Sequence, residues 1–198
     1  MAGSVVKLHT QKSLSLDEAR AEDLSLRYAG ADALDILHGA LKEEFPGKLA
    51  LVSSFGAESA VLLHLAAQVD PDVPVVFLET GKHFAQTLSY RKKLASQLGL
   101  TNIHDIRPVA DEVAADDPEG DLWRRNPDQC CTLRKVRPLD HALSGYDAWI
   151  TGRKQFHGGA RVRLPAFEFS GQHFKVNPIV SWTPEDVAAY FEKHALPA

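Results

Sequence analysis

The sequence lacks the features that mark secreted and membrane-spanning proteins. Only two of its 198 residues are cysteine, too few for a disulfide framework. No apolar run approaches the roughly 20 residues that cross a bilayer, and the stretch from Ala60 to Ala67 is interrupted by His64. Met1 to Thr10 does not have the charged-then-apolar layout of a signal peptide. We therefore expect a cytoplasmic protein with no membrane association.

An excess of positive charge is also missing. The 22 Lys and Arg residues are outnumbered by 26 Asp and Glu residues, which leaves a formal net charge of -4. This balance argues against a protein that neutralises a nucleic-acid backbone, so no nucleic-acid partner is expected. With 44% hydrophobic and 24% charged residues the composition is that of a globular protein. Any anionic ligand must be met by a local cluster of positive residues.

The chain is predicted to be a single domain with a helical N-terminal segment. Leucines at helical spacing up to residue 48 predict helices packed on the core over residues 1–48. From residue 49 to 198, apolar β-rich runs occur at Leu49–Ser53, Val73–Leu78, Ile103–Arg107 and Ala148–Thr151. Helical stretches alternate with them at Glu58–Val69, Gln86–Leu98 and about Cys130–Leu143. This alternation predicts an α/β fold with three layers, in which helices cover both faces of a parallel sheet.

The last third of the sequence changes character. Leu164–Ile179 is typical of a β-hairpin that turns at Ser170-Gly171. Thr183 is a natural N-cap for a final helix, and Pro184 suits its first position.

The segment from Ser53 to Ser59 follows the first predicted strand and precedes its helix. Its small residues let backbone N–H groups approach an oxyanion, and the helix N-terminus adds partial positive charge. An ordinary strand-to-helix turn with a serine cap is the alternative, but this position is where α/β sheets bind ligands. A Walker P-loop is excluded because the Gly-Lys-Ser/Thr ending is missing. The candidate binding residues are Ser53, Ser54, Phe55, Gly56, Ala57, Glu58 and Ser59.

A second candidate is the end of the next predicted strand, Leu78-Glu79-Thr80-Gly81. Strand ends on this side of a parallel sheet line the same crevice, where Thr80 and Gly81 would let backbone groups contact a base or ribose. The alternative is an ordinary strand-end turn.

A third candidate is a basic, glycine-containing loop. Four permanent positive charges, Arg153, Lys154, Arg161 and Arg163, flank His157 and Gly158-Gly159. Such a loop suits a lid that closes over a phosphate or sulfate. A solvated run of charges is the alternative.

The two cysteines are adjacent, at Cys130 and Cys131, and are followed by Arg134, Lys135 and Arg137. A disulfide between neighbours is strained, whereas cations lower the pKa of a thiol and make it a better nucleophile or ligand. Packing as small core hydrophobes is the alternative. Consecutive helical residues point about 100° apart, so both thiols do not share a core stripe, but both can reach an iron–sulfur cluster at a helix end.

These segments, in this order, resemble the sulfonucleotide (adenylyl-sulfate and phosphoadenylyl-sulfate) reductases from about Leu49 to Ala198. Leu51–Ser59 is similar to the family's modified pyrophosphatase loop, and Leu78–Gly81 matches its Leu-Asp-Thr-Gly motif with Glu in place of Asp. Cys130–Leu139 resembles the paired-cysteine helix of the family. The remaining similarities are Thr151–Gln155, at the start of its arginine-rich lid, Lys175–Ile179 and Trp182–Val187.

The resemblance implies an adenine-nucleotide α-hydrolase-like (HUP) fold and the thioredoxin-dependent reduction of adenosine 5′-phosphosulfate to sulfite and AMP in assimilatory sulfate reduction. The paired cysteines imply the branch that carries a [4Fe–4S] cluster, with Cys130 and Cys131 as metal ligands, rather than the branch that uses the 3′-phosphorylated substrate. Lys135 is implied to place a positive charge near cluster and substrate. Gly152 and Gln155 join the implied substrate-binding residues.

The resemblance also implies a second cysteine pair and a nucleophilic cysteine beyond Ala198, so the 198 residues supply only half of the cluster ligands and no catalytic thiol. We therefore expect a chain that is incomplete for catalysis by itself. The alternatives are an ATP-pyrophosphatase-type adenylating enzyme of the same fold and a non-catalytic nucleotide-binding module. The oligomeric state stays open, a homo-oligomer included.

Overall fold

The computed structural model describes residues 14–161 and 163–197. The expected absence of a signal peptide concerns residues 1–10, which lie outside the described residues. Within the described ranges, no helix combines the length and apolarity needed to cross a membrane.

The core of the molecule is one six-stranded sheet in the order β3-β2-β1-β4-β6-β5. The strands are β1 (Leu49–Val52), β2 (Val75–Leu78), β3 (Ile103–Ile106), β4 (Ala148–Ile150), β5 (Phe167–Ser170) and β6 (His173–Val176). All neighbouring strands pair in parallel except β5 and β6, which are antiparallel. A two-residue turn joins β5 to β6, and only antiparallel strands can be joined so tightly. The predicted parallel sheet and hairpin are confirmed.

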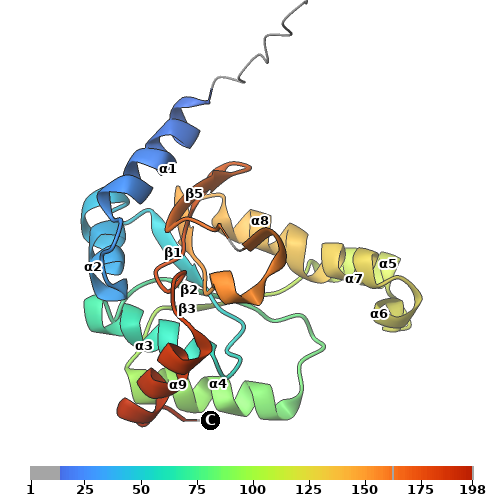
Figure 1. Cartoon of the computed structure of the whole chain (residues 1–198). Helices are drawn as coiled ribbons and strands as arrows, with labels where there is room; N and C mark the ends of the chain where they lie inside the picture. The colour runs from blue at the N-terminus through green and yellow to red at the C-terminus, as the bar shows by residue number, and fades with distance from the viewer. Residues whose placement is uncertain (1–13, 162, 198) are drawn as a thin grey trace, which may run out of the picture.

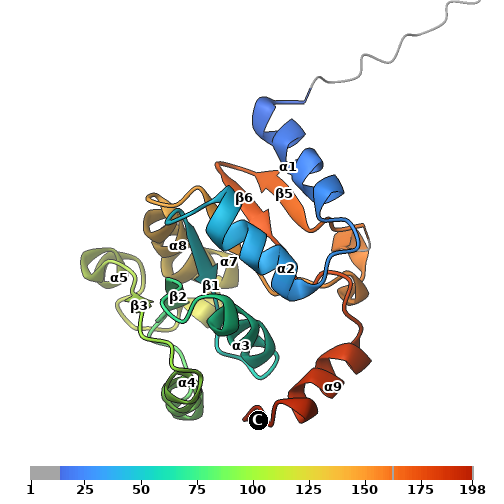
Figure 2. The same ribbon diagram turned by 90° about the vertical axis from the view of Figure 1, so that its left-hand side faces the viewer.

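Helices cover both faces of the sheet because successive strand residues point to opposite sides. Leu51 of β1 packs in a cluster with residues of α2 (Ala33–His38) and α3 (Ser59–Val69). Ala50, its neighbour, packs on the other face with Leu143 of α8 (Arg137–Leu143). Figure 2 shows α2 and α3 in front of the sheet and α8 behind it. The expected three layers are therefore present.

Residues 14–48, the described part of the predicted N-terminal helical segment, lie against this core. Helix α1 (Leu16–Arg27) begins with a capping box at Ser15 and lies beside β5. Ser25 Oγ donates to the Phe167 carbonyl at 2.7 Å and accepts from the Phe167 N–H at 3.1 Å, so its hydroxyl occupies part of the open edge of β5. A π-helical turn, η1 (Gly39–Glu44), continues α2 toward β1.

Two further helices flank the sheet. Helix α4 (Ala85–Leu98) connects β2 to β3, and α9 (Pro184–Lys193) begins at the predicted Thr183 cap, where Thr183 and Asp186 form a capping box. Tyr190 of α9 is hydrogen-bonded to His64 of α3, with 2.8 Å between the hydroxyl and Nδ1, so α9 lies beside α3 (Figure 1).

The segment between β3 and β4 differs from the prediction. The helix expected from Cys130 begins earlier, because Asn126 caps α7 (Pro127–Cys131), which runs through η2 (Thr132–Val136) into α8. Short helices α5 (Ala110–Asp116) and α6 (Leu122–Arg125) precede it and were not expected. Together α5, α6 and α7 form an arm at one side of the molecule (Figure 1).

Candidate functional site

The segment from Ser53 to Ser59 and the start of the basic loop meet in one cavity of about 470 Å³, which we call the loop pocket. It lies at the carboxyl ends of β1 and β4, which are neighbours in the sheet. Its lining residues are Val52, Ser53, Ser54, Gly56, Ala57, Glu58, Ser59, Leu62, Gly152, Lys154 and His157. The structure therefore brings together residues that are about a hundred positions apart along the chain, as the ligand-site prediction requires.

Backbone donors are available in this pocket. The turn before α3 is closed by the N–H groups of Ser59 and Ala60, which donate to the carbonyls of Gly56 and Ala57 at 2.8 and 3.2 Å. Among the described residues, no group accepts a hydrogen bond from the N–H of Gly56, Ala57 or Glu58. Free N–H groups at a helix N-terminus are typical of anion-binding sites in proteins.

A buried ammonium group lies in the same pocket. The Lys154 side chain is 3% exposed, and its Nζ donates to Glu58 Oε2 at 2.8 Å. It also donates to the Gly152 carbonyl at 3.3 Å. The hydrogen bond from Lys154 lowers the pKa of Glu58, against the opposing effect of burial, and electrostatic interactions with Lys154 and His157 lower it further. The pocket therefore combines a lysine charge with unpaired backbone donors.

Phe55 shapes the loop, and it is not among the residues that line the pocket. It has a left-handed backbone with φ of 52°, rare for a bulky residue. Its ring is 1% exposed and meets Phe77 edge-on, with 5.6 Å between ring centroids. The guanidinium of Arg91 lies 5.6 Å from the centroid of the Phe55 ring. The Phe55 N–H donates to Ser53 Oγ at 3.1 Å, so the ring and the serine together fix the bend.

The basic loop is folded back on the protein, and most of its charges lie outside the loop pocket. Arg153 forms an ion pair with Glu168 of β5. Gln155 Nε2 donates to the Leu164 carbonyl at 2.9 Å. Arg161 contacts His157, with 3.1 Å between Nη1 and Nδ1, and Arg163 is exposed. In this arrangement Lys154 and Gly152 are the loop's predicted binding residues that reach the pocket.

The end of β2 lines a separate cavity of about 540 Å³, which we call the β2 cavity. Glu79, Thr80 and Gly81 line it, whereas Leu78 does not. Glu79 Oε1 accepts from the Gly81 N–H at 2.9 Å, so the glutamate closes the turn. Gly81 has φ of +70°, and a Cβ there would lie 3.6 Å from Arg134 Nη1. The two predicted loops thus lie at the same sheet edge but line neighbouring cavities.

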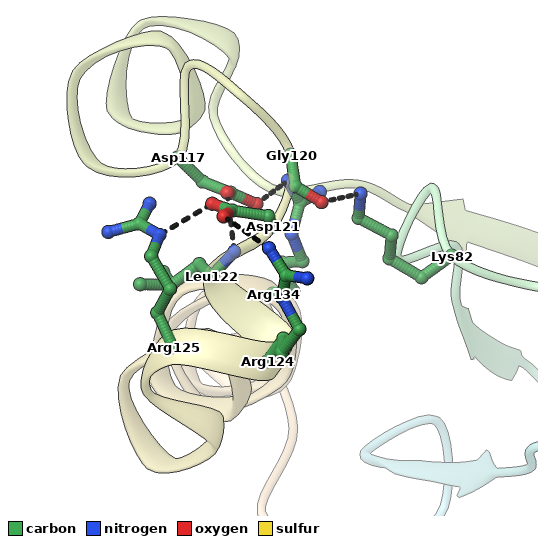
Figure 3. A network of polar contacts seen from close by, with 8 residues as sticks. All are labelled: Lys82, Asp117, Gly120, Asp121, Leu122, Arg124, Arg125 and Arg134. Carbon is green, nitrogen blue, oxygen red and sulfur yellow. Dashed lines mark hydrogen bonds and ion pairs between the residues drawn. The ribbon is translucent and has the colours of Figure 1, made fainter.

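Arg134 ties this turn to the arm. Its Nη1 donates to the Thr80 carbonyl at 2.9 Å and its Nη2 to Asp117 Oδ2 at 2.6 Å. Burial opposes ionisation of Asp117, but hydrogen bonds from Arg134 and from the Leu122 N–H outweigh it and lower the Asp117 pKa. Figure 3 shows Arg134, Asp117 and Leu122 close together, with Lys82 extending toward Gly120. The Nζ of Lys82 donates to the Gly120 carbonyl at 2.6 Å.

No pattern in the sequence indicates Asp117, because it lies in a short polar segment. Arg134 is visible only as one of several cations after the cysteines.

The paired cysteines have different surroundings. Cys130 is buried against Leu122 and Leu133, whereas Cys131 is exposed, and both are free thiols. Lys135 is also exposed. No group of three or more His, Cys, Asp or Glu side chains within the described residues is arranged to hold a metal ion. A four-iron cluster takes four thiolates, so these residues do not fit a complete cluster site.

Comparison with known proteins identifies the family. The model of the phosphoadenosine phosphosulfate reductase domain matches residues 48–198. The chain belongs to this family. The adenosine 5′-phosphosulfate reductase of Mesorhizobium japonicum is 46% identical over 178 residues, covering 90% of this chain and 70% of the relative. The chain is thus related to oxidoreductases that act on sulfur groups.

Solved structures agree with the fold. A phosphoadenylyl-sulfate reductase from Candida auris, in a phosphate complex, has a TM-score of 0.77 at 27% identity and covers 94% of this chain and 91% of its own. The NH3-dependent NAD synthetase of Campylobacter jejuni has a TM-score of 0.53 at 16% identity, with 89% and 74% covered. This second likeness concerns the fold alone and supports the expected HUP-like architecture.

Proposed function

We propose that this chain binds adenosine 5′-phosphosulfate and serves its thioredoxin-dependent reduction to sulfite and AMP. The observation that carries the proposal is the loop pocket, which is lined both by the three residues with free N–H groups and by the buried Lys154. Such preorganised donors stabilise an anion without rearrangement of solvent. The similarity to a reductase named for adenosine 5′-phosphosulfate, at 46% identity, favours this substrate over the 3′-phosphorylated one.

In the proposed reaction a thiolate attacks the sulfate sulfur, and a sulfur–sulfur bond forms as the sulfur–oxygen bond to phosphate breaks. The electron pair of the broken bond leaves on AMP. A dithiol reductant of the thioredoxin type then releases sulfite and is itself oxidised to a disulfide. The resemblance assigns the attacking thiol to a segment after Ala198. The loop pocket would hold the phosphate that departs with AMP and stabilise its developing charge.

The iron–sulfur cluster has no step in this proposal. Cys130 and Cys131 would contribute two of its four thiolates, and no described neighbour completes the set. The residues of this chain act on the nucleotide: the N–H groups orient its anion, and Lys154 supplies the opposite charge.

Isothermal titration calorimetry with the purified chain tests the proposal. We expect adenosine 5′-phosphosulfate to bind more tightly than adenosine, and Lys154→Met to remove most of that difference. The exposed Lys193, at the end of α9, offers a matched control as Lys193→Met. Absence of binding to any adenylated sulfate, or cleavage of ATP to AMP and pyrophosphate, would reject the proposal in favour of an adenylating enzyme.

A further inference from the structure

The ion pair between Lys154 and Glu58 in the loop pocket is strongly asymmetric. The Lys154 side chain is 3% exposed, whereas that of Glu58 is 60% exposed. Lysine is a buried cation at the wall of the pocket, and its carboxylate partner comes from the solvent side, 96 residues away in the chain. One partner is therefore fixed by packing and the other is free to leave.

The buried ammonium needs a negative partner. A charge removed from water is costly unless it is paired and hydrogen-bonded. Within the described residues, Glu58 is the acidic group bonded to Lys154, and the Gly152 carbonyl is its other acceptor. The other groups placed near Lys154, the ring of Phe156 at 5.6 Å from Nζ and the pocket residue His157, bring no negative charge. Glu58 thus supplies the counter-charge that the empty pocket requires.

The Glu58 carboxylate also lies where an incoming anion would bind. Its own backbone N–H is one of the three free donors, and Glu58 is among the residues that line the same cavity. An anion that accepted hydrogen bonds from these N–H groups and from Lys154 would meet the carboxylate at short range, where like charges repel.

We propose that Glu58 is a built-in competitor, which an anionic ligand must displace from Lys154 before it can bind. This inference rests on the proposed function for the identity of the nucleotide. Glu58 balances the charge of Lys154 when no ligand is bound. Because a ligand must displace Glu58, a strongly anionic group binds more readily than a weakly anionic one. A neutral nucleoside cannot take over the ammonium, so it gains nothing from the exchange. Glu58 is in this sense a specificity-determining residue.

The decisive variant is Glu58→Gln, which keeps the shape of the side chain and removes the competing charge. We expect adenosine 5′-phosphosulfate to bind about 2- to 5-fold more tightly, the range measured for partly exposed ion pairs, while adenosine binds as before. Glu192→Gln, an exposed carboxylate of α9 outside the pocket, makes the same change in net charge and should alter neither affinity. A gain in affinity cannot be produced by partial unfolding.

The mechanism of the gain is tested by a double-mutant cycle. In a Lys154→Met background, Glu58→Gln should improve binding less than about 1.5-fold, because there is no ammonium to release. The same gain in both backgrounds would overturn the proposal, since Glu58 would then act only through long-range repulsion. If the wild-type protein binds adenosine 5′-phosphosulfate, unchanged or weaker binding of that ligand to Glu58→Gln would also overturn it.

Inorganic pyrophosphate, used as a second probe, separates this inference from the proposed function. If pyrophosphate gains affinity in Glu58→Gln while no protein binds the phosphosulfate, the competitor role stands and the proposed substrate is wrong. If wild-type protein binds the phosphosulfate but Glu58→Gln brings no gain with either probe, the proposed function stands and the competitor role is wrong. If the wild-type protein binds neither probe, both the proposed function and the competitor role are wrong.

Discussion

Replacing Phe55 by alanine tests whether the buried ring sets the geometry of the anion site. The ring is 1% exposed and contacts Phe77, and the backbone at φ of 52° stays strained when alanine replaces it. Truncation of a buried phenylalanine costs about 3–5 kcal/mol. For a chain of this length that corresponds to a fall of about 6–20 °C in Tm.

The loss of the ring should also weaken ligand binding. Without its anchor, the turn spreads over several conformations, and the N–H groups of Gly56 and Ala57 no longer converge. Loss of one hydrogen bond to a charged group is worth about 1.5–3 kcal/mol, so we expect an affinity for adenosine 5′-phosphosulfate about 10- to 100-fold lower.

The control is Phe45→Ala. Phe45 is 2% exposed and packs on Phe174 with 5.1 Å between ring centroids, at the opposite end of the strands from the loop pocket. Guanidinium-induced unfolding should show a similar loss of stability for both variants, and calorimetry should show weaker binding for Phe55→Ala alone. Equal losses of affinity, or wild-type affinity in Phe55→Ala, would refute the anchoring role.

Three further predictions follow from buried or paired charges. Asp117→Asn leaves Arg134 buried without its counter-charge and should lower the urea midpoint of unfolding. Adding Arg134→Met to that variant should restore part of the lost stability. If the losses of stability from the two single substitutions simply add in the double variant, the pairing is contradicted. Burial, with a nearby histidine, lowers the pKa of His64, so the folded state favours its neutral form. The free energy of unfolding should be at its full value above about pH 6.5, the ordinary pKa of histidine, and should fall as the pH drops toward the lowered pKa. If the denaturation midpoints of a His64→Gln variant depend on pH between 7.5 and 5 as steeply as those of the wild-type protein, this reasoning is wrong. Arg153→Ala removes the ion-pair partner of Glu168 and should lower the Tm, while the affinity for adenosine 5′-phosphosulfate changes less than about 3-fold. A roughly tenfold weaker affinity at unchanged Tm would instead favour a role for Arg153 in a lid over the ligand.

Local patterns in the sequence determined the architecture. Short apolar runs such as Val75–Leu78 alternate with amphipathic or apolar helices, and the positions of strands follow because burial on both faces demands continuous apolar residues. The cap at Thr183 and the turn at Gly171 depend on one or two residues, so they too were visible. The short helices α5 and α6 were not, because segments of seven and four residues carry too little periodicity.

The chemistry of the loop between Ser53 and Ser59 was also local, since small residues before a helix expose backbone donors wherever they occur. Which charges face that loop was a matter of tertiary structure. Lys154 and Arg153 are neighbours in sequence, yet one is buried against Glu58 and the other pairs with Glu168. Adjacent residues after a strand point to opposite sides, and their partners come from segments brought together only by the crossovers of the sheet. The sequence by itself therefore predicted an anion-binding loop at this sheet edge, and the folded chain decided which cation faces that loop.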